Sequence, residues 1–234
     1  ESFLKKTYGI ILVTGPTGSG KTTTLYSALK VLSTSEVNIV TIEDPIEMVV
    51  EEFNQVGVQQ HIGVDFANSL RTILRQDPDI IMVGEIRDKD TATNAVQAAL
   101  TGHLVLSTLH TNNAASSLTR LMDLGVPAFL VNSTVLGVVA QRLVRKICPQ
   151  CKKQRILLPE EREYLRLKER EYNISYGEGC SDCRGTGYKG RIGVFEMMPM
   201  TDRLKAMTAT TADVEAIEKE ARAEGMSTLR ESAV

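Results

Sequence analysis

Short continuous runs of apolar residues recur along the first half of the chain, and each run ends abruptly in polar residues. Runs of this length that are rich in Val, Ile and Leu are typical of strands buried on both faces. We predict such strands at 9–15, 37–45, 79–85 and 103–111. Apolar residues at helical spacing between and after them predict helices at 22–34, 69–78, 91–102 and 117–125. Strands that alternate with helices indicate a mainly parallel sheet with both faces covered.

The pattern changes after Arg145. A basic stretch is followed by a charge-dense segment that we predict to be a helix over 160–172, and then by a Gly-rich stretch. Residues 191–198 have the alternation of a strand, and 213–225 predict an amphipathic helix that ends at Gly225. The later part of the chain is therefore expected to form a small annex with a C-terminal helical segment.

The composition narrows the possible classes of protein. The chain has 234 residues, 42% of them hydrophobic, which suffices for one large domain or for one domain with an annex. The formal net charge is −2, so the chain as a whole lacks the excess of positive charge that is typical of proteins that bind nucleic acid or an anionic membrane. No apolar run approaches the ~20 residues that span a bilayer, and no signal peptide is visible. Because the first predicted strand begins soon after Glu1, we expect that an N-terminal domain of a longer protein is missing.

A Gly-rich loop joins the first predicted strand to the first predicted helix. Its sequence, GPTGSGKT, matches the phosphate-loop pattern GxxxxGK[ST] in the required strand–loop–helix setting. Glycines let backbone N–H groups turn inward onto phosphates, and the helix N-terminus adds its dipole. Lys21 is expected to reach the β- and γ-phosphates, and Thr22 to offer its hydroxyl to Mg²⁺. The predicted nucleotide-binding residues are Gly15, Pro16, Thr17, Gly18, Ser19, Gly20, Lys21, Thr22 and Thr23.

Carboxylates follow two of the predicted strands. Glu43 and Asp44 end the second strand, and Glu85 ends the third. Phosphoryl transfer to water needs one acidic group near the metal ion and another that orients the attacking water. Ligands of parallel sheets bind at the carboxyl ends of strands, so these side chains could supply both groups. An ordinary surface carboxylate is the alternative, above all for Asp44 and Glu47.

Five segments resemble the secretion-ATPase superfamily of type II secretion and type IV pilus assembly. They are GPTGSGKTT, TIEDPIE, RQDPDIIMVGEIRD, TGHLVLSTLHTN and AQRLVRKICPQC. The resemblance runs in order from Gly9 to about Pro199, and several motifs at compatible spacing are more specific than a phosphate loop alone. It implies a RecA-like P-loop NTPase core, ATP as the substrate and Mg²⁺ as a cofactor.

The resemblance also implies roles for individual residues. It assigns Glu85 to Mg²⁺, directly or through water, because this family ends the strand with Gly-Glu. It assigns Glu43 to the polarisation of the attacking water, and it places His103 and His110 near the γ-phosphate. Without it, each histidine reads as a core or capping residue. The arginines that it implies in nucleotide binding or contact with a neighbouring subunit are Arg75, Arg87 and, less strongly, Arg71.

Four cysteines form two CxxC pairs, Cys148 with Cys151 and Cys180 with Cys183. Each pair can place two thiolates on one tetrahedral ion, so together they predict a closed structural Zn²⁺ site. An iron–sulfur site and redox thiols are the competing readings, and the basic CKKQR segment leaves nucleic-acid binding by a zinc ribbon open. The tetracysteine element resembles that of the secretion and pilus-extension branch rather than that of pilus-retraction ATPases.

These observations predict three parts: a RecA-like ATPase core at 1–145, a Cys₄ zinc-binding element at 146–190, and a C-terminal strand and helices at 191–234. The predicted function is ATP hydrolysis that powers type II protein secretion through pseudopilus assembly. Type IV pilus extension is the alternative within the superfamily, and a nucleic-acid translocase with a zinc ribbon is the alternative from another class. A small-molecule kinase would need an acceptor pocket and a lid, which no segment indicates.

The resemblance further implies partners and a location. It predicts a homo-hexamer that is cytoplasmic and peripheral on the cytoplasmic face of the bacterial inner membrane. The implied partners are an inner-membrane platform protein and the cytoplasmic part of a membrane-anchored secretion component. No nucleic-acid partner is expected.

Overall fold

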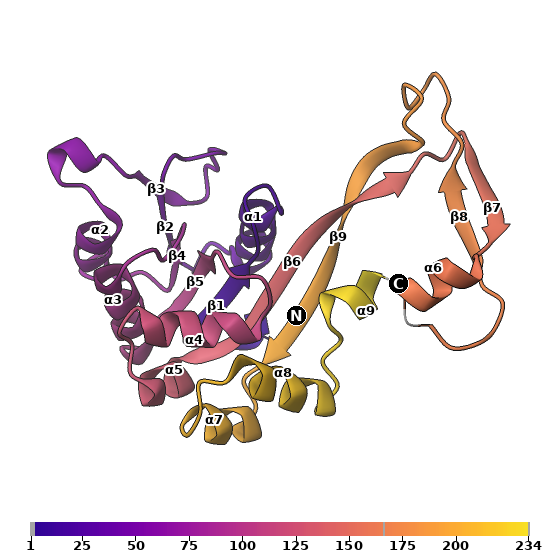
Figure 1. Ribbon diagram of the computed structural model, residues 1–234. Coiled ribbons are helices and arrows are strands. Elements are labelled where there is room, and N and C mark those ends of the chain that lie inside the picture. The colour runs from indigo at the N-terminus through magenta and orange to yellow at the C-terminus, as the bar shows by residue number, and fades with distance from the viewer. Residues whose placement is uncertain (1–2, 166, 234) are drawn as a thin grey trace. The chain divides into compact units, whose positions relative to one another are not determined.

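The computed structural model describes residues 3–165 and 167–233 (Figure 1). The chain divides into two compact units, one formed by Glu1–Arg142 with Val194–Val234 and the other by Leu143–Gly193. We describe each unit by itself. The three-part division expected above assigns a function to each part. A division into compact units does not test functions, so the three-part division remains a prediction.

One sheet organises the larger unit. Its strand order is β3-β2-β4-β5-β1-β6-β9, and the pairs β3/β2, β2/β4, β4/β5, β5/β1 and β1/β6 are parallel. The strands are β1 (Gly9–Thr14), β2 (Ile39–Glu43), β3 (Asn54–Gly57), β4 (Ile80–Val83), β5 (Leu104–Leu109), β6 (Val135–Ile147) and β9 (Tyr188–Pro199). The predicted fold class, a mainly parallel α/β core with an annex, is therefore confirmed.

Helices follow most of the strands. In the larger unit they are α1 (Lys21–Leu32), α2 (Phe66–Ile73), α3 (Lys89–Leu100), α4 (Ala115–Asp123), α5 (Ala128–Thr134), α7 (Asp202–Thr208), α8 (Val214–Ala223) and α9 (Leu229–Ala233). Short 3₁₀ turns lie at Phe3–Lys5 and Gln60–Ile62. Two of the starts are fixed by N-caps, because the carboxylates of Asp65 and Asp88 accept the backbone N–H groups of Asn68 and Thr91 at 2.7 and 2.8 Å. The helix predicted from residue 69 therefore starts at Phe66.

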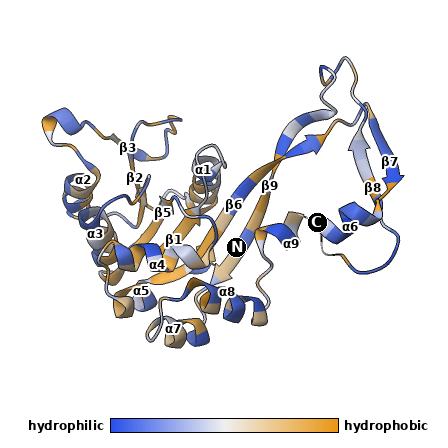
Figure 2. Cartoon of the chain, viewed as in Figure 1, coloured by the Kyte–Doolittle hydropathy of each residue, from blue (hydrophilic) through white to orange (hydrophobic). Residues whose placement is uncertain are grey.

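Alternation along each central strand builds two separate cores. On β1, Ile10 and Leu12 belong to the core that packs under α2–α5, whereas Ile11 and Val13 belong to the core under α1. The strands β1, β2, β4 and β5 are accordingly buried along their whole length and carry mostly apolar residues (Figure 2). Since successive side chains point to opposite faces, this parity also decides which face each polar residue at a strand end will reach.

Several elements were missed in the sequence. The edge strand β3 and the strand β6 mix polar and apolar residues, so the continuous apolar run of a fully buried strand does not mark them. The helix α5 has only seven residues, too few to show a helical repeat of apolar positions. The strand expected at 191–198 lies within the longer β9, and the helix expected at 213–225 corresponds to α8. Among the described helices, none has the length and apolar character that a bilayer crossing requires.

The smaller unit contains an antiparallel pair, β7 (Lys152–Ile156) and β8 (Asn173–Gly177), and the short helix α6 (Pro159–Tyr164). The helix predicted over 160–172 was too long. Ile156 pairs with Asn173, and the Leu157 N–H donates to the Tyr172 carbonyl oxygen at 2.8 Å. A helix over 160–172 would carry the chain about 18 Å along its axis, so the pairing of the strands ends the helix early.

Candidate functional site

The phosphate loop joins β1 to α1 and is shaped by glycines that no other residue could replace. Gly15 has φ +152°, and a Cβ there would lie 2.5 Å from the carbonyl oxygen of Gln141 and 2.6 Å from Ser19 Oγ. Gly20 caps α1 in the left-handed region at φ +86° and offers no side-chain acceptor to the helix. The first N–H groups of α1 therefore remain available to an anion.

Two buried polar groups in the loop fit a phosphate ligand. Ser19 is 4% exposed, and its hydroxyl has no hydrogen-bond partner among the described residues. Lys21 Nζ donates to the carbonyl oxygens of Gly15 and Pro16 at 3.0 and 3.2 Å. Burial lowers the pKa of Lys21, and the charge of Glu85 opposes this effect. A phosphate oxygen would accept from both side chains, so the residues present fit the nucleotide predicted from the sequence.

The middle of β6 holds this loop from a distant part of the sequence. The Gln141 amide donates to the carbonyl oxygen of Ser19 at 2.8 Å and accepts from the Thr24 hydroxyl at 2.7 Å. The next residue, Arg142, donates to the Gln141 and Asn112 carbonyl oxygens at 3.1 and 2.9 Å. Both residues lie inside the AQRLVRKICPQC segment, but no local pattern pointed to the phosphate loop.

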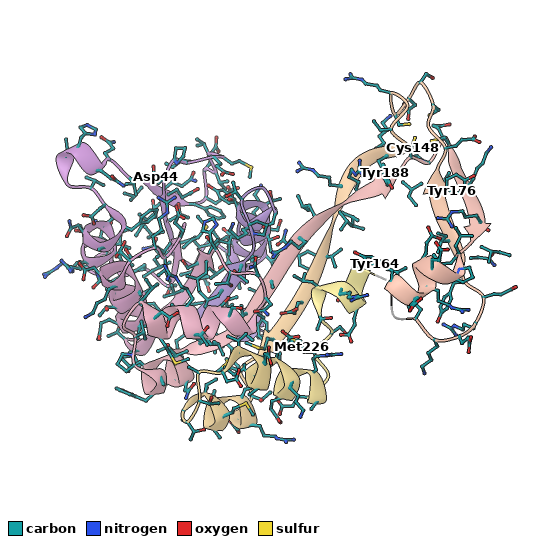
Figure 3. The ribbon with its side chains drawn as sticks, in the orientation of Figure 1. Asp44, Cys148, Tyr164, Tyr176, Tyr188 and Met226 are labelled. Carbon is teal, nitrogen blue, oxygen red and sulfur yellow. The ribbon has the colours of Figure 1, made fainter. Side chains whose placement is uncertain are left out.

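Glu43 lies at the carboxyl end of β2 and faces α1. It shares this face with Ile39 and Thr41, four and two residues earlier, because side chains alternate along the strand. Its carboxylate is 2% exposed and accepts hydrogen bonds from Tyr26, Thr41 and Gln55. The sequence indicated Glu43 but gave no sign of the donors on α1 and β3. Asp44, which follows it, is exposed (Figure 3).

Glu85 follows β4 and collects two further predicted residues. Its carboxylate lies 2.5 Å from Arg87 Nη2 and 3.2 Å from His110 Nε2, and its side chain is 12% exposed. Gly84 allows this strand end to pack against β2, since a Cβ on Gly84 would lie 3.1 Å from the Ile42 carbonyl oxygen. The structure therefore brings Glu85, Arg87 and His110 together at the carboxyl edge of the sheet.

Three other predicted residues lie elsewhere. His103 precedes β5 at its amino end, and its Nδ1 lies 2.9 Å from the Ala98 carbonyl oxygen. His110 lies at the other end of the same strand, roughly 23 Å along it. Arg75 lies in the turn before β4, at the amino edge, and Arg71 on the exposed surface of α2. His103 and Arg75 therefore lie at the opposite edge of the sheet from Glu85 and His110, because parallel strands separate their two ends.

The loop after β5 is fixed by buried polar contacts that the sequence did not reveal. The Thr14 hydroxyl lies 2.7 Å from that of Thr111, which lies 2.7 Å from that of Ser117. Glu196 on β9 is 2% exposed and accepts the backbone N–H of Ala114 at 2.7 Å. These contacts hold the chain directly after His110.

The smaller unit gathers the four cysteines. The Sγ atoms of Cys148, Cys151, Cys180 and Cys183 all lie within 4.8 Å of one another. Cys148 lies next to the start of β9, where its N–H donates to the Gly187 carbonyl oxygen at 2.9 Å, close to Tyr188 (Figure 3). One tetrahedral ion with S ligands fits this donor set.

Backbone N–H groups point at the sulfur atoms, as thiolate ligands require. Cys183 Sγ accepts from the N–H groups of Cys180 and Gly187, both at 3.2 Å, and Cys151 Sγ accepts from Gly179 at 3.3 Å. Burial disfavours the Cys183 thiolate, but these N–H donors, together with hydrogen bonds from Cys180 and Cys151, outweigh burial and lower the pKa of Cys183. At Cys151 burial outweighs the Gly179 N–H and raises the pKa. The cluster thus has the donors that stabilise metal-binding thiolates.

Comparisons with known proteins agree along the whole chain. A family model described as "Type II/IV secretion system protein" matches residues 1–234. The chain is 54% identical over 236 residues to the type IV pilus assembly ATPase TfpB of Acinetobacter baylyi, covering 98% of this chain and 40% of that protein. It is 51% identical over 221 residues to the type II secretion system ATPase E of Vibrio cholerae, covering 94% of this chain and 44% of that protein.

A solved structure supports the same likeness. The crystal structure of the pilus retraction motor PilT with bound ADP matches with a TM-score of 0.67 and 28% sequence identity, covering 99% of this chain and 62% of that chain. The chain spans less than half the length of the two curated relatives named above.

Proposed function

The chain belongs to the type II/IV secretion system protein family, and from this we propose that it is the ATP-hydrolysing part of a motor for type II protein secretion through pseudopilus assembly. The family resemblance stated from the motifs is thereby confirmed. The observation that carries the proposal is the phosphate loop, with its buried Lys21 and with a Ser19 hydroxyl that has no partner among the described residues. The charge of Glu85 acts on Lys21, and α1, the helix that follows the loop, contacts Glu43 through Tyr26. The bound ADP in the PilT structure supports a nucleotide as the ligand of this chain.

Each residue has a distinct task in this proposal. The N–H groups of the loop and Lys21 bind the β- and γ-phosphates. Thr22 and Glu85 would hold Mg²⁺, which when bound would neutralise charge on the phosphate oxygens. Glu43 orients and polarises the attacking water, and His110 and Arg87 fix the Glu85 carboxylate through the contacts described above.

The larger assembly is part of the same proposal. A ring of six copies would let Arg75 and His103, at the amino edge of the sheet, and Arg71, on the exposed surface of α2, act on the site of a neighbouring copy. The expected location is the cytoplasmic face of the inner membrane, with a membrane platform protein and the cytoplasmic part of a membrane-anchored component as partners. Type IV pilus assembly is the second candidate, supported by the 54% identity to TfpB.

Hydrolysis is tested by measuring phosphate release from ATP, with and without DNA, in the complete protein to which this chain belongs. We expect turnover that DNA does not change, because the chain has a formal net charge of −2 and no overall basic footprint. Stimulation by single- or double-stranded DNA would contradict the secretion motor and favour the translocase. The absence of any turnover in the assembled protein would contradict the ATPase itself.

The four cysteines are proposed to hold one structural Zn²⁺. Metal analysis should find about one zinc per chain, and removing it with a chelator should unfold the smaller unit, because zinc supplies ~10–16 kcal/mol in zinc-finger peptides. Hydrogen exchange should then show lost protection in β7 and β8 while β1, β4 and β5 stay protected. Cys151→Ser should have the same effect and the exposed Ser181→Ala none. A folded, metal-free smaller unit would contradict this assignment.

A further inference from the structure

The buried carboxylate of Glu43 is held by an arrangement that the proposed roles do not explain. An ionised carboxylate that is 2% exposed is strongly destabilising unless hydrogen bonds compensate for its lost hydration. Three side chains from three elements provide them: Tyr26 from α1, Thr41 from β2 itself, and Gln55 from β3. Such a convergence fixes the carboxylate in one orientation.

The two carboxylate oxygens are not equivalent. Oε1 lies 2.7 Å from Thr41 Oγ1 and 3.1 Å from Gln55 Nε2, so it has two donors of its own. The Tyr26 hydroxyl lies 2.8 Å from Oε1 and 2.7 Å from Oε2, and a hydroxyl has a single proton. Among the residues that the structure describes, Tyr26 is the one hydrogen-bond donor to Oε2. Oε2 therefore retains the capacity to accept a hydrogen bond from a water molecule.

Tyr26 links this oxygen to the phosphate loop. It lies on α1 one turn after Thr22, on the same helix that begins at Lys21. Its side chain is 1% exposed and its ring packs 6.1 Å from that of Phe53, centroid to centroid. The buried ring therefore holds the hydroxyl on the helix that begins at the loop that would bind the phosphates.

The hydroxyl also has a second acceptor. It lies 3.0 Å from the Met48 carbonyl oxygen, and Gln55 Nε2 donates to the same carbonyl oxygen at 3.0 Å and to the Tyr26 oxygen at 2.9 Å. The Tyr26 proton can therefore turn between Glu43 and Met48. Turning it to Met48 frees Oε2 completely, without moving the carboxylate.

We propose that Tyr26 is a positioning residue that orients the Glu43 carboxylate so that Oε2 receives the attacking water. Gln55, which donates to both side chains, supports the same orientation. This inference rests on the proposed role of Glu43 in ATP hydrolysis. Burial, and then the hydrogen bond to Glu43, raises the pKa of Tyr26 well above its usual value. The hydroxyl therefore stays protonated and remains a donor at neutral pH.

The test replaces Tyr26 with Phe, which keeps the ring and removes the hydroxyl. In the complete protein, we expect kcat for ATP to fall about 10- to 100-fold, since a small misplacement of a reacting group can cost ~10²-fold. The KM for ATP and the affinity for a fluorescent ATP analogue should change less than twofold. Tyr8→Phe, at an exposed tyrosine outside the site, is the matched control and should keep normal turnover.

A double variant separates positioning from a general structural effect. If Tyr26 acts through Glu43, then Tyr26→Phe should lower the residual single-turnover rate of Glu43→Gln no further. An additive loss, or normal kcat in Tyr26→Phe, would overturn the inference. Gln55→Met, at a partly exposed position on the edge strand β3, is the second variant and should lower kcat at constant KM even if Tyr26→Phe does not fold.

The outcomes also separate this inference from the proposed function. If Glu43→Gln loses turnover while Tyr26→Phe and Gln55→Met keep it, the inference is wrong and the proposed function holds. If Glu43→Gln itself keeps normal turnover, the proposed role of Glu43 is wrong.

Discussion

Replacing Glu43 with Gln should leave nucleotide binding intact and reduce ATP turnover about 10²- to 10⁴-fold, the range that general-base catalysis contributes. Gln has nearly the same shape but carries no charge, so it cannot polarise a water molecule as a carboxylate does. Binding should persist because the phosphates are bound by the loop and by Lys21 rather than by Glu43. Equilibrium titration with a fluorescent ATP analogue and phosphate release under saturating ATP measure the two quantities separately.

The matched control is Glu51→Gln, which removes an exposed carboxylate from the segment that follows Glu43. It should change neither affinity nor turnover. Glu43→Gln also alters a buried hydrogen-bonded group, so its melting temperature should be compared with that of the unmodified protein. Normal turnover in a folded Glu43→Gln variant would refute the assignment of Glu43.

Lys21→Ala should weaken nucleotide affinity, the quantity that Glu43→Gln leaves unchanged. Lys21 is 9% exposed, and its ammonium group donates to two carbonyl oxygens of the phosphate loop. When a nucleotide binds, the ammonium group would donate to a phosphate oxygen instead. Losing a hydrogen bond to a charged group amounts to about 1.5–3 kcal/mol, or roughly a 10- to 100-fold weaker affinity. Titration of the same ATP analogue measures the loss.

Lys30→Ala is the control for this variant, because Lys30 is exposed in the last turn of the same helix. It should bind the analogue as the unmodified chain does. If Lys21→Ala bound ATP with unchanged affinity while folded, the loop would not be the phosphate site, and the proposed function would lose the observation on which it rests.

The sequence predicted the parts of the site that are contiguous in the chain. The phosphate loop is one such part, because a strand, a Gly-rich turn and a helix N-terminus lie within a short segment and need no distant partner to be recognised. The two CxxC pairs are another, since their spacing alone allows a tetrahedral site. The segment 160–172 shows the limit of local patterns, because the pairing of β7 with β8 overrode its helical character.

Topology adds to these predictions the edge of the sheet at which each residue lies. In a parallel sheet all carboxyl ends lie at one edge, so His103, which precedes its strand, belongs to the opposite edge from His110. The same argument separates Arg75 from Arg87. The family resemblance placed both histidines near the γ-phosphate and left open whether each arginine acts in its own chain or on a neighbouring subunit, because motifs do not show at which edge of the sheet a residue lies.

By itself, the sequence determined the mainly parallel sheet, the phosphate loop and the family, because these depend on periodicity and on motifs within short segments. Only the tertiary structure decided which residues surround the loop. Gln141 meets Ser19, and Tyr26 and Gln55 meet Glu43, across separations of up to 122 residues. Such contacts depend on strand order and on the face that each side chain occupies, and the packing of the whole sheet sets both.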